Sequence, residues 1–130
     1  MVIVDTSVWV DVLRDGSGGE RDALAVAVGD DEAALTRFTQ LELLQGARDE
    51  REWGLLQETL ETQLYAELRP ATWPDAARIY FDLRRNGRTV RSPIDCCIAQ
   101  IAIDHGAMLL HRDRDFEEIA AIRPLRQARL

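Results

Sequence analysis

Two short apolar runs, each followed closely by aspartate, limit most strongly what this chain can fold into. Val2-Ile3-Val4 precedes Asp5, and Met108-Leu109-Leu110 precedes Asp113 and Asp115. Three successive apolar residues predict a strand that is buried on both faces, as strands of a parallel sheet are. Segments with helical periodicity separate the predicted strands. We therefore expect a three-layer α/β domain with a mainly parallel central sheet.

Length and composition predict one globular domain over residues 1–130, because 46% of the residues are hydrophobic and can form a core. No apolar run approaches the ~20 residues of a membrane span. The N-terminus enters strand and helix without a basic leader. Cys96 and Cys97 are adjacent and lack partners at metal-ligand spacing, which predicts buried thiols in a reducing compartment. We expect a cytoplasmic protein without membrane attachment.

Caps and apolar spacing predict the element boundaries. Ser7 is expected to cap a first helix, and Thr39 with Glu42 forms a capping-box pattern. Thr72 is expected to cap a long helix, and Ser92-Pro93 to open another. Further helices are expected at about 20–28, 39–47, 49–64 and 116–121, and strands at about 1–5, 33–36, 65–69 and 108–111.

In the long helix, Trp73, Ala77, Tyr80 and either Leu83 or Arg84 are spaced to share one face. Residues 84–91 after it are predicted to form a basic loop. Gly106 is expected to end the helix that Ser92 opens.

Five carboxylates fall where the strand ends and helix starts of such a sheet would gather them. They are Asp5, Glu42, Asp95, Asp113 and Asp115. Each also has a separate structural explanation, because Glu42 and Asp95 fit the first turn of a helix and aspartate is common in turns. A carboxylate directly after a buried strand, however, needs a partner. One cation site accounts for all five acids together.

The chemistry of these side chains narrows the choice of cation. Carboxylate oxygens are hard ligands that favour Mg²⁺ or Mn²⁺ over zinc. Neither His105 nor His111 has another His or Cys at zinc-ligand spacing, and His111 is expected to be a solvated residue at a strand end. The sequence therefore predicts a magnesium- or manganese-dependent phosphoryl-transfer site.

Two other classes of function are weighed beside this one. A phosphatase or phosphotransferase with an Asp nucleophile, of the haloacid-dehalogenase type, needs a second Asp two residues after the first. Ser7 stands there, and the chain has no lysine to serve as that family's basic residue. A non-enzymatic binding module could use the acids as a docking surface. Loss of a core acid would favour that module, and none is missing.

Four segments, in order along almost the whole chain, resemble the motifs of the PIN-domain ribonucleases and, among them, the VapC toxins of bacterial toxin–antitoxin pairs. The segments are VIVDTSVW (2–9), TQLELLQG (39–46), SPIDCCIA (92–99, continuing to 105–106) and HRDRDF (111–116). His111 departs from the pattern, because the family often has Thr or Ser at this position. That hydroxyl is auxiliary, so the departure affects fine positioning only.

The resemblance implies a metal-dependent endoribonuclease that acts as a toxin. It implies that Asp5, Asp95 and Asp113 are the main ligands of Mg²⁺ or Mn²⁺, and that Asp115 assists directly or through water. Glu42 would bind a second ion or orient the attacking water. The residues expected to be catalytic are Asp5, Glu42, Asp95 and Asp113.

The expected partners are RNA, a second copy of the chain and a small VapB-like antitoxin. The net charge of −7 opposes RNA binding, but residues 1–65 carry −9 (5 Arg, 14 acids) and residues 66–130 carry +2 (11 Arg, 9 acids). Arginine binds phosphate in bidentate fashion. The arginines expected to hold the RNA backbone are Arg84, Arg85, Arg88 and Arg91. The apolar residues expected to support dimerisation are Val8, Trp9, Leu13, Leu43 and Leu44.

Overall fold

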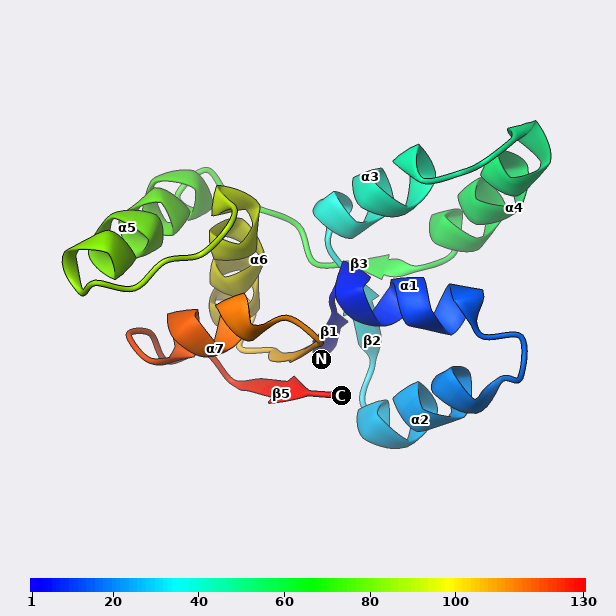
Figure 1. Ribbon diagram of the computed structural model, residues 1–130, viewed down its shortest axis with the longest axis horizontal. Coiled ribbons are helices and arrows are strands. Elements are labelled where there is room, and N and C mark those ends of the chain that lie inside the picture. The colour runs from blue at the N-terminus through cyan, green and yellow to red at the C-terminus, as the bar shows by residue number, and fades with distance from the viewer.

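A five-stranded sheet lies at the centre of the computed structural model, which describes residues 1–130, and seven helices surround it (Figure 1). The strands are β1 (Val2–Val4), β2 (Ala33–Leu35), β3 (Leu64–Tyr65), β4 (Met108–His111) and β5 (Gln127–Arg129). The helices are α1 (Thr6–Arg14), α2 (Gly19–Val28), α3 (Arg37–Gln45), α4 (Glu50–Glu61), α5 (Thr72–Arg85), α6 (Pro93–Asp104) and α7 (Arg114–Ala120). The expected α/β architecture is confirmed.

The sheet is parallel throughout, with the strand order β3-β2-β1-β4-β5. The chain runs outward from β1 through β2 to β3, and then returns to the other side of β1 for β4 and β5. In such sheets the ligand crevice lies beyond the carboxyl ends of the strands where the order reverses. Here that point lies between β1 and β4. Val4 is paired with Leu110, so the residues that follow both strands emerge side by side.

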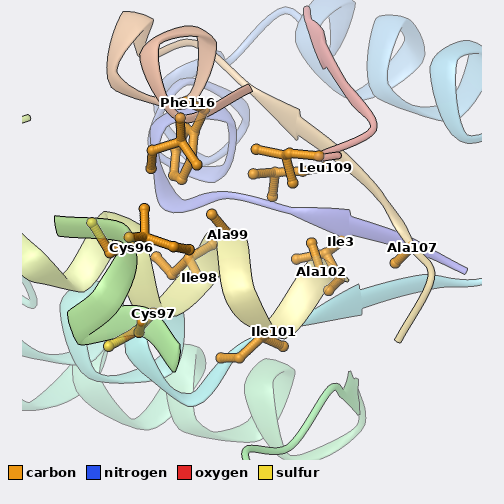
Figure 2. Close-up of a cluster of buried hydrophobic side chains, with 14 of the residues drawn as sticks. Ile3, Cys96, Cys97, Ile98, Ala99, Ile101, Ala102, Ala107, Leu109 and Phe116 are labelled. Atoms are coloured by element: carbon orange, nitrogen blue, oxygen red, sulfur yellow. The ribbon is translucent and has the colours of Figure 1, made fainter. Parts of the chain in front are cut away.

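The two faces of the sheet bury alternate residues of the same strands. Ile3 and Leu109 face the larger cluster, which α5, α6 and α7 complete; Figure 2 shows them beside Phe116 and the buried side of α6. Val4 and Leu110 face the opposite way, toward α1 and α2. This explains why both strands are continuous apolar runs. The free thiols of Cys96 and Cys97 are buried, as expected.

Three predicted helix caps are wrong. Asp5, not Ser7, caps α1, because its side chain accepts the N–H of Ser7. α3 starts earlier than expected, since Thr36 directly after β2 caps it by accepting the N–H of Thr39. The capping box of Thr39 and Glu42 therefore does not form. Thr72 is the first helical residue of α5, and its hydroxyl donates instead to Asp104 at 2.8 Å.

The predicted face of α5 is wrong by one residue, except that Leu83, one of the two alternatives for its last position, is buried as expected. Ile79 and Leu83 are buried on this helix, together with Thr72 and Ala76, whereas Trp73 is 55% exposed. Packing against α6, the closest partner of α5 in the fold, selects the smaller aliphatic stripe.

Further differences lie at element ends. α4 ends at Glu61, so Leu64 belongs to β3 and not to the helix. Arg84 and Arg85 lie in the last turn of α5, not in a loop. Strand β5 was not predicted, because Gln127-Ala128-Arg129 is an edge strand without an apolar run. Ser92 does cap α6, and Gly106 follows its end with a φ of 61°, as expected. No helix is long and apolar enough to cross a membrane.

Candidate metal centre

Three carboxylates converge at the carboxyl edge of the sheet. One oxygen each of Asp95, Asp113 and Asp115 lies within 4.8 Å of the others, and we call these residues the acid trio. Asp113 follows β4 and caps α7, where its Oδ1 accepts the N–H of Asp115 at 3.0 Å. Asp95 is the third residue of α6, after the cap Ser92 and Pro93. The trio thus joins two helix starts at the end of one strand.

Asp5 and Glu42 form a second pair of acids beside the trio. Asp5 follows β1 and is only 6% exposed, and its Oδ2 accepts both the N–H and the hydroxyl of Ser7, at 3.0 and 2.6 Å. Both bonds use Oδ2, so Oδ1 is free of them. Glu42, on α3, accepts a hydrogen bond from the Thr6 hydroxyl at 3.1 Å.

Electrostatics connect the two groups of acids. The pKa of Asp95 is raised to about 7, first by burial and then by the negative charges of Asp113 and Asp5, with a hydrogen bond to Asp115 adding to the effect. The pKa of Glu42 is also raised, mainly by burial; the bond from Thr6 opposes this, and the charge of Asp5 adds to it. Like charges that raise a carboxyl pKa are a mark of converging acids. Asp5 acts on both sides of the site.

Two hydroxyl groups position Asp5 and Glu42, and the sequence alone did not assign them this role. Ser7 donates to Asp5 and accepts the backbone N–H of Arg112 at 2.9 Å, so it ties the ends of β1 and β4 together. Thr6, which bonds Glu42, also lies 3.0 Å from the hydroxyl oxygen of Thr39. The sequence feature that could have indicated this role is the position of Thr6 and Ser7 directly after Asp5.

His111 is fully buried, so the expectation of a solvated histidine is wrong. Its Nδ1 accepts the backbone N–H of Asp113 at 3.1 Å, so the proton belongs on Nε2, which donates to Gln127 at 2.6 Å. Its ring lies 5.1 Å from that of Phe116. The unpredicted strand β5 supplies Gln127 and covers the histidine. His111 therefore supports the turn that presents Asp113.

The four arginines expected to hold RNA lie in three different settings. Arg91 reaches the acid trio, with its Nη2 2.6 Å from Asp113 Oδ2 and its Nε 3.2 Å from Asp115 Oδ2. Arg88 pairs with Glu118 on α7 at 2.8 Å. The exposed Arg84 and Arg85 make no ion pair; their guanidinium carbons lie 5.3 and 5.6 Å from the ring centres of Tyr80 and Phe81, respectively.

The donor set of the trio fits a hard divalent cation. It offers only carboxylate oxygens, which are the ligands that Mg²⁺ and Mn²⁺ prefer. The nitrogen and sulfur groups are otherwise engaged or inert: both ring nitrogens of His111 are bonded, and burial raises the pKa of the nearby Cys96 thiol to about 12. A divalent cation held by these carboxylates would polarise a phosphoryl oxygen and activate water.

A parallel sheet with acids gathered at the switch point between β1 and β4 defines an α/β protein with a candidate carboxylate metal site. Comparison with known proteins identifies its family. The model of the PIN domain family matches residues 2–122. The chain belongs to the PIN-domain family.

Within this family, the chain is similar to individual VapC and VapBC proteins. The chain is 38% identical to the ribonuclease VapC11 of Mycobacterium tuberculosis, over 98% of each chain. Its fold matches the solved structure of VapBC-1 from nontypeable Haemophilus influenzae with a TM-score of 0.79, at 18% identity over 99% of this chain and 98% of that one. It also matches VapBC2 of Rickettsia felis, solved with a promoter DNA fragment, with a TM-score of 0.77, at 17% identity over 100% and 99% of the chains.

Proposed function

We propose that this protein is a Mg²⁺- or Mn²⁺-dependent endoribonuclease and the toxin component of a toxin–antitoxin pair. The observation that carries the proposal is the acid trio, whose oxygens lie within 4.8 Å of one another at the switch point of the sheet. The identity of 38% to a ribonuclease over nearly the whole chain supports RNA as the substrate. RNA phosphodiester hydrolysis needs the phosphate charge neutralised and a water activated, which is what such a site provides.

Each acid has a proposed role. Asp5, Asp95, Asp113 and Asp115 hold the cation, which when bound supplies Lewis-acid chemistry to the scissile phosphate. Asp5 contributes through Oδ1, because Ser7 engages Oδ2. Glu42 orients the attacking water and accepts its proton; burial raises the pKa of this carboxyl, which makes it a stronger base than an exposed glutamate.

The test compares two acids in the first turns of neighbouring helices. Asp95 is in the first turn of α6 and Asp75 is in the first turn of α5, away from the trio. We expect Asp95→Asn to lower the rate of RNA cleavage by orders of magnitude and to remove the gain in melting temperature that wild type shows on adding Mn²⁺ in place of EDTA. Asp75→Asn should keep both. Cleavage that survives in Asp95→Asn, with melting that ignores Mn²⁺ in wild type, would overturn the nuclease proposal.

A groove between α1, α3 and α4 supports an antitoxin partner for this chain. It has a volume of about 730 Å³ and mixes apolar with charged walls. Leu13 and Leu55 on it are 45% and 53% exposed, and Glu42 also lines it, so a segment bound there would reach the catalytic edge. Amphipathic segments bind such grooves through their apolar face. Solved structures that share the fold include a toxin–antitoxin complex from Klebsiella pneumoniae and VapBC-5 of Mycobacterium tuberculosis, a member of the VapBC family of toxin–antitoxin systems.

Fewer apolar residues are available for dimerisation than the sequence predicted, because two of the five expected residues are buried. Val8 and Leu43 are buried in the protein's own core, whereas Leu13 is exposed and Trp9 and Leu44 are half-buried. We propose that the remaining apolar residues still support a homodimer. Light scattering at tens of micromolar, with and without the antitoxin, tests both partners. A monomer whose mass does not change on adding the antitoxin would contradict them.

A further inference from the structure

Arg91 makes three hydrogen bonds to the acid trio, more than any other basic residue makes there. Its Nη2 donates to Asp113 Oδ2 at 2.6 Å, and its Nε and its backbone N–H donate to Asp115 Oδ2 at 3.2 and 3.1 Å. A planar guanidinium can span two carboxylates in this way because its donors have a fixed geometry. The arginine thus lies on two of the oxygens that a cation would need.

At Asp113, the Arg91 guanidinium and a cation would compete for the same carboxylate oxygen. The Oδ1 of this residue is already used, because it caps α7 by accepting the N–H of Asp115. Oδ2 is therefore the oxygen most open to a cation, and it is the one that Arg91 binds. A cation and the guanidinium cannot share that direction of approach.

The guanidinium can leave without rearranging the fold. The side chain of Arg91 is 76% exposed, whereas those of Asp113 and Asp115 are 18% and 6% exposed, so it covers the acids from the solvent side. The backbone N–H of Arg91 bonds Asp115 independently, and the preceding Val90 is buried in the core. These contacts hold the loop in place when the side chain moves. Because the guanidinium is mostly in contact with solvent, it can exchange its carboxylate contacts for water from that side.

We propose that Arg91 is a built-in counter-cation of the acid trio, which a divalent cation must displace from Asp113 and Asp115. The inference rests on the proposed metal-dependent function and concerns the chain's own residue, not the cation. It assigns Arg91 two effects of opposite sign. The arginine stabilises the metal-free protein by neutralising converging acids, and it lowers the affinity of the site for the metal.

The experiment measures Mn²⁺ binding to the full, antitoxin-free chain by calorimetry, and melting in EDTA. Arg91→Gln should bind Mn²⁺ about threefold to fivefold more tightly than wild type, which corresponds to about 0.6–1 kcal/mol, and should melt at a lower temperature in EDTA. Arg91→Lys keeps the charge but lacks the planar fork, so its affinity should lie between the two. Arg88→Gln is the matched control from the same loop, because Arg88 pairs with Glu118; it should bind Mn²⁺ as wild type does.

Each outcome separates this inference from the proposed function. Mn²⁺ binding by wild type together with equal or weaker binding by Arg91→Gln overturns the role of Arg91 and leaves the metal site intact. An affinity of Arg91→Lys as high as that of Arg91→Gln also overturns it, because a retained positive charge would then not compete with the cation. If neither wild type nor Arg91→Gln binds Mn²⁺, the metal site fails and the inference with it. Tighter binding by Arg91→Gln in an order that places Arg91→Lys between supports displacement.

Discussion

The two ends of α6 carry one aspartate each, and their environments differ in an instructive way. Asp95 lies in the first turn, where the helix dipole favours a negative charge, and Asp104 is the last residue, where the dipole opposes one. The pKa shifts run against both expectations. The pKa of Asp95 is raised to about 7 by burial and by its acidic neighbours, whereas the pKa of Asp104 is lowered.

The partners of Asp104 explain its behaviour. Burial acts to raise its pKa, but hydrogen bonds from Gln100 and Thr72 and the charge of Arg69 outweigh burial. This carboxylate is fully satisfied by groups that favour its charge. Asp95 instead faces carboxylates across the sheet edge. An acid that the fold satisfies has a structural role, and an acid that the fold crowds with like charges is suited to bind a cation.

The largest expected difference between the two ends is in catalysis. Asp95→Asn should lower the rate of RNA cleavage by on the order of 10²–10³-fold, the scale for loss of one preorganised electrostatic group. Asp104→Asn should stay within about twofold of wild type, since the residue lies at the other end of the helix and does not approach the trio; this twofold bound reflects only the usual small effect of remote substitutions. Single-turnover cleavage with saturating Mn²⁺ measures both. Comparable losses of cleavage rate in the two variants would show that the two aspartates do not differ in their importance for catalysis.

Stability should show the reverse order. Asp104→Asn removes the charge that Thr72, Gln100 and Arg69 surround, so the free energy of unfolding should fall by about 2 kcal/mol, within the range for hydrogen bonds to charged groups. Urea titrations in EDTA at pH 7.5 provide the measurement. Gln100→Leu, which removes a single partner, should show a smaller loss. An Asp104→Asn variant as stable as wild type would mean that these contacts contribute nothing.

The pH dependence should differ in sign between the two ends. The folded pKa of Asp95 is above its unfolded value, so folded protein binds the extra proton and wild type loses stability as pH rises from about 4 to about 7. Asp95→Asn lacks this loss. In EDTA, its free energy of unfolding relative to that of wild type should therefore rise across this pH window, by on the order of 1–2 kcal/mol after discounting for solvent screening.

The lowered pKa of Asp104 acts oppositely, because its contribution is present above the unfolded pKa and is lost as pH falls toward the folded pKa. Melting temperatures of wild type and both variants from about pH 2 to pH 8 separate the two effects, because the Asp104 contribution is lost only below the unfolded pKa and the Asp95 contribution changes above it. A constant difference between wild type and Asp95→Asn over this range would argue against crowding of the acids.

The smallest expected effect concerns arginines that lack carboxylate partners. Arg84 and Arg85 are exposed on α5 without ion pairs, so we expect them to contact RNA phosphates. Replacing both with Gln should weaken RNA binding in EDTA by about threefold to tenfold and flatten its salt dependence by roughly one unit of slope per lost contact. Replacing Arg21 and Arg51 of the acidic half removes the same charge and should leave the slope unchanged. An unaltered slope for the α5 variant would exclude these contacts.

Local sequence determined the parts of this protein that depend on neighbours within about four residues. Apolar triplets specified β1 and β4 together with the acids that follow them, and the Ser92-Pro93 pair specified the start of α6, hence the place of Asp95. Because parallel strands share one carboxyl edge, these local features were enough to predict that the acids would gather.

Tertiary structure alone decided which groups the acids meet. The dipole of α6 favours a charge on Asp95 and opposes one on Asp104, and only the packing of α6 beside β4 and α5 reverses this by giving Asp95 acidic neighbours and Asp104 the partners Arg69 and Thr72. The burial of His111 depended on a strand without an apolar pattern, and the bonds of Arg91 to Asp113 join residues 22 positions apart. Contacts between distant residues depend on topology and packing, which periodicity and capping do not encode.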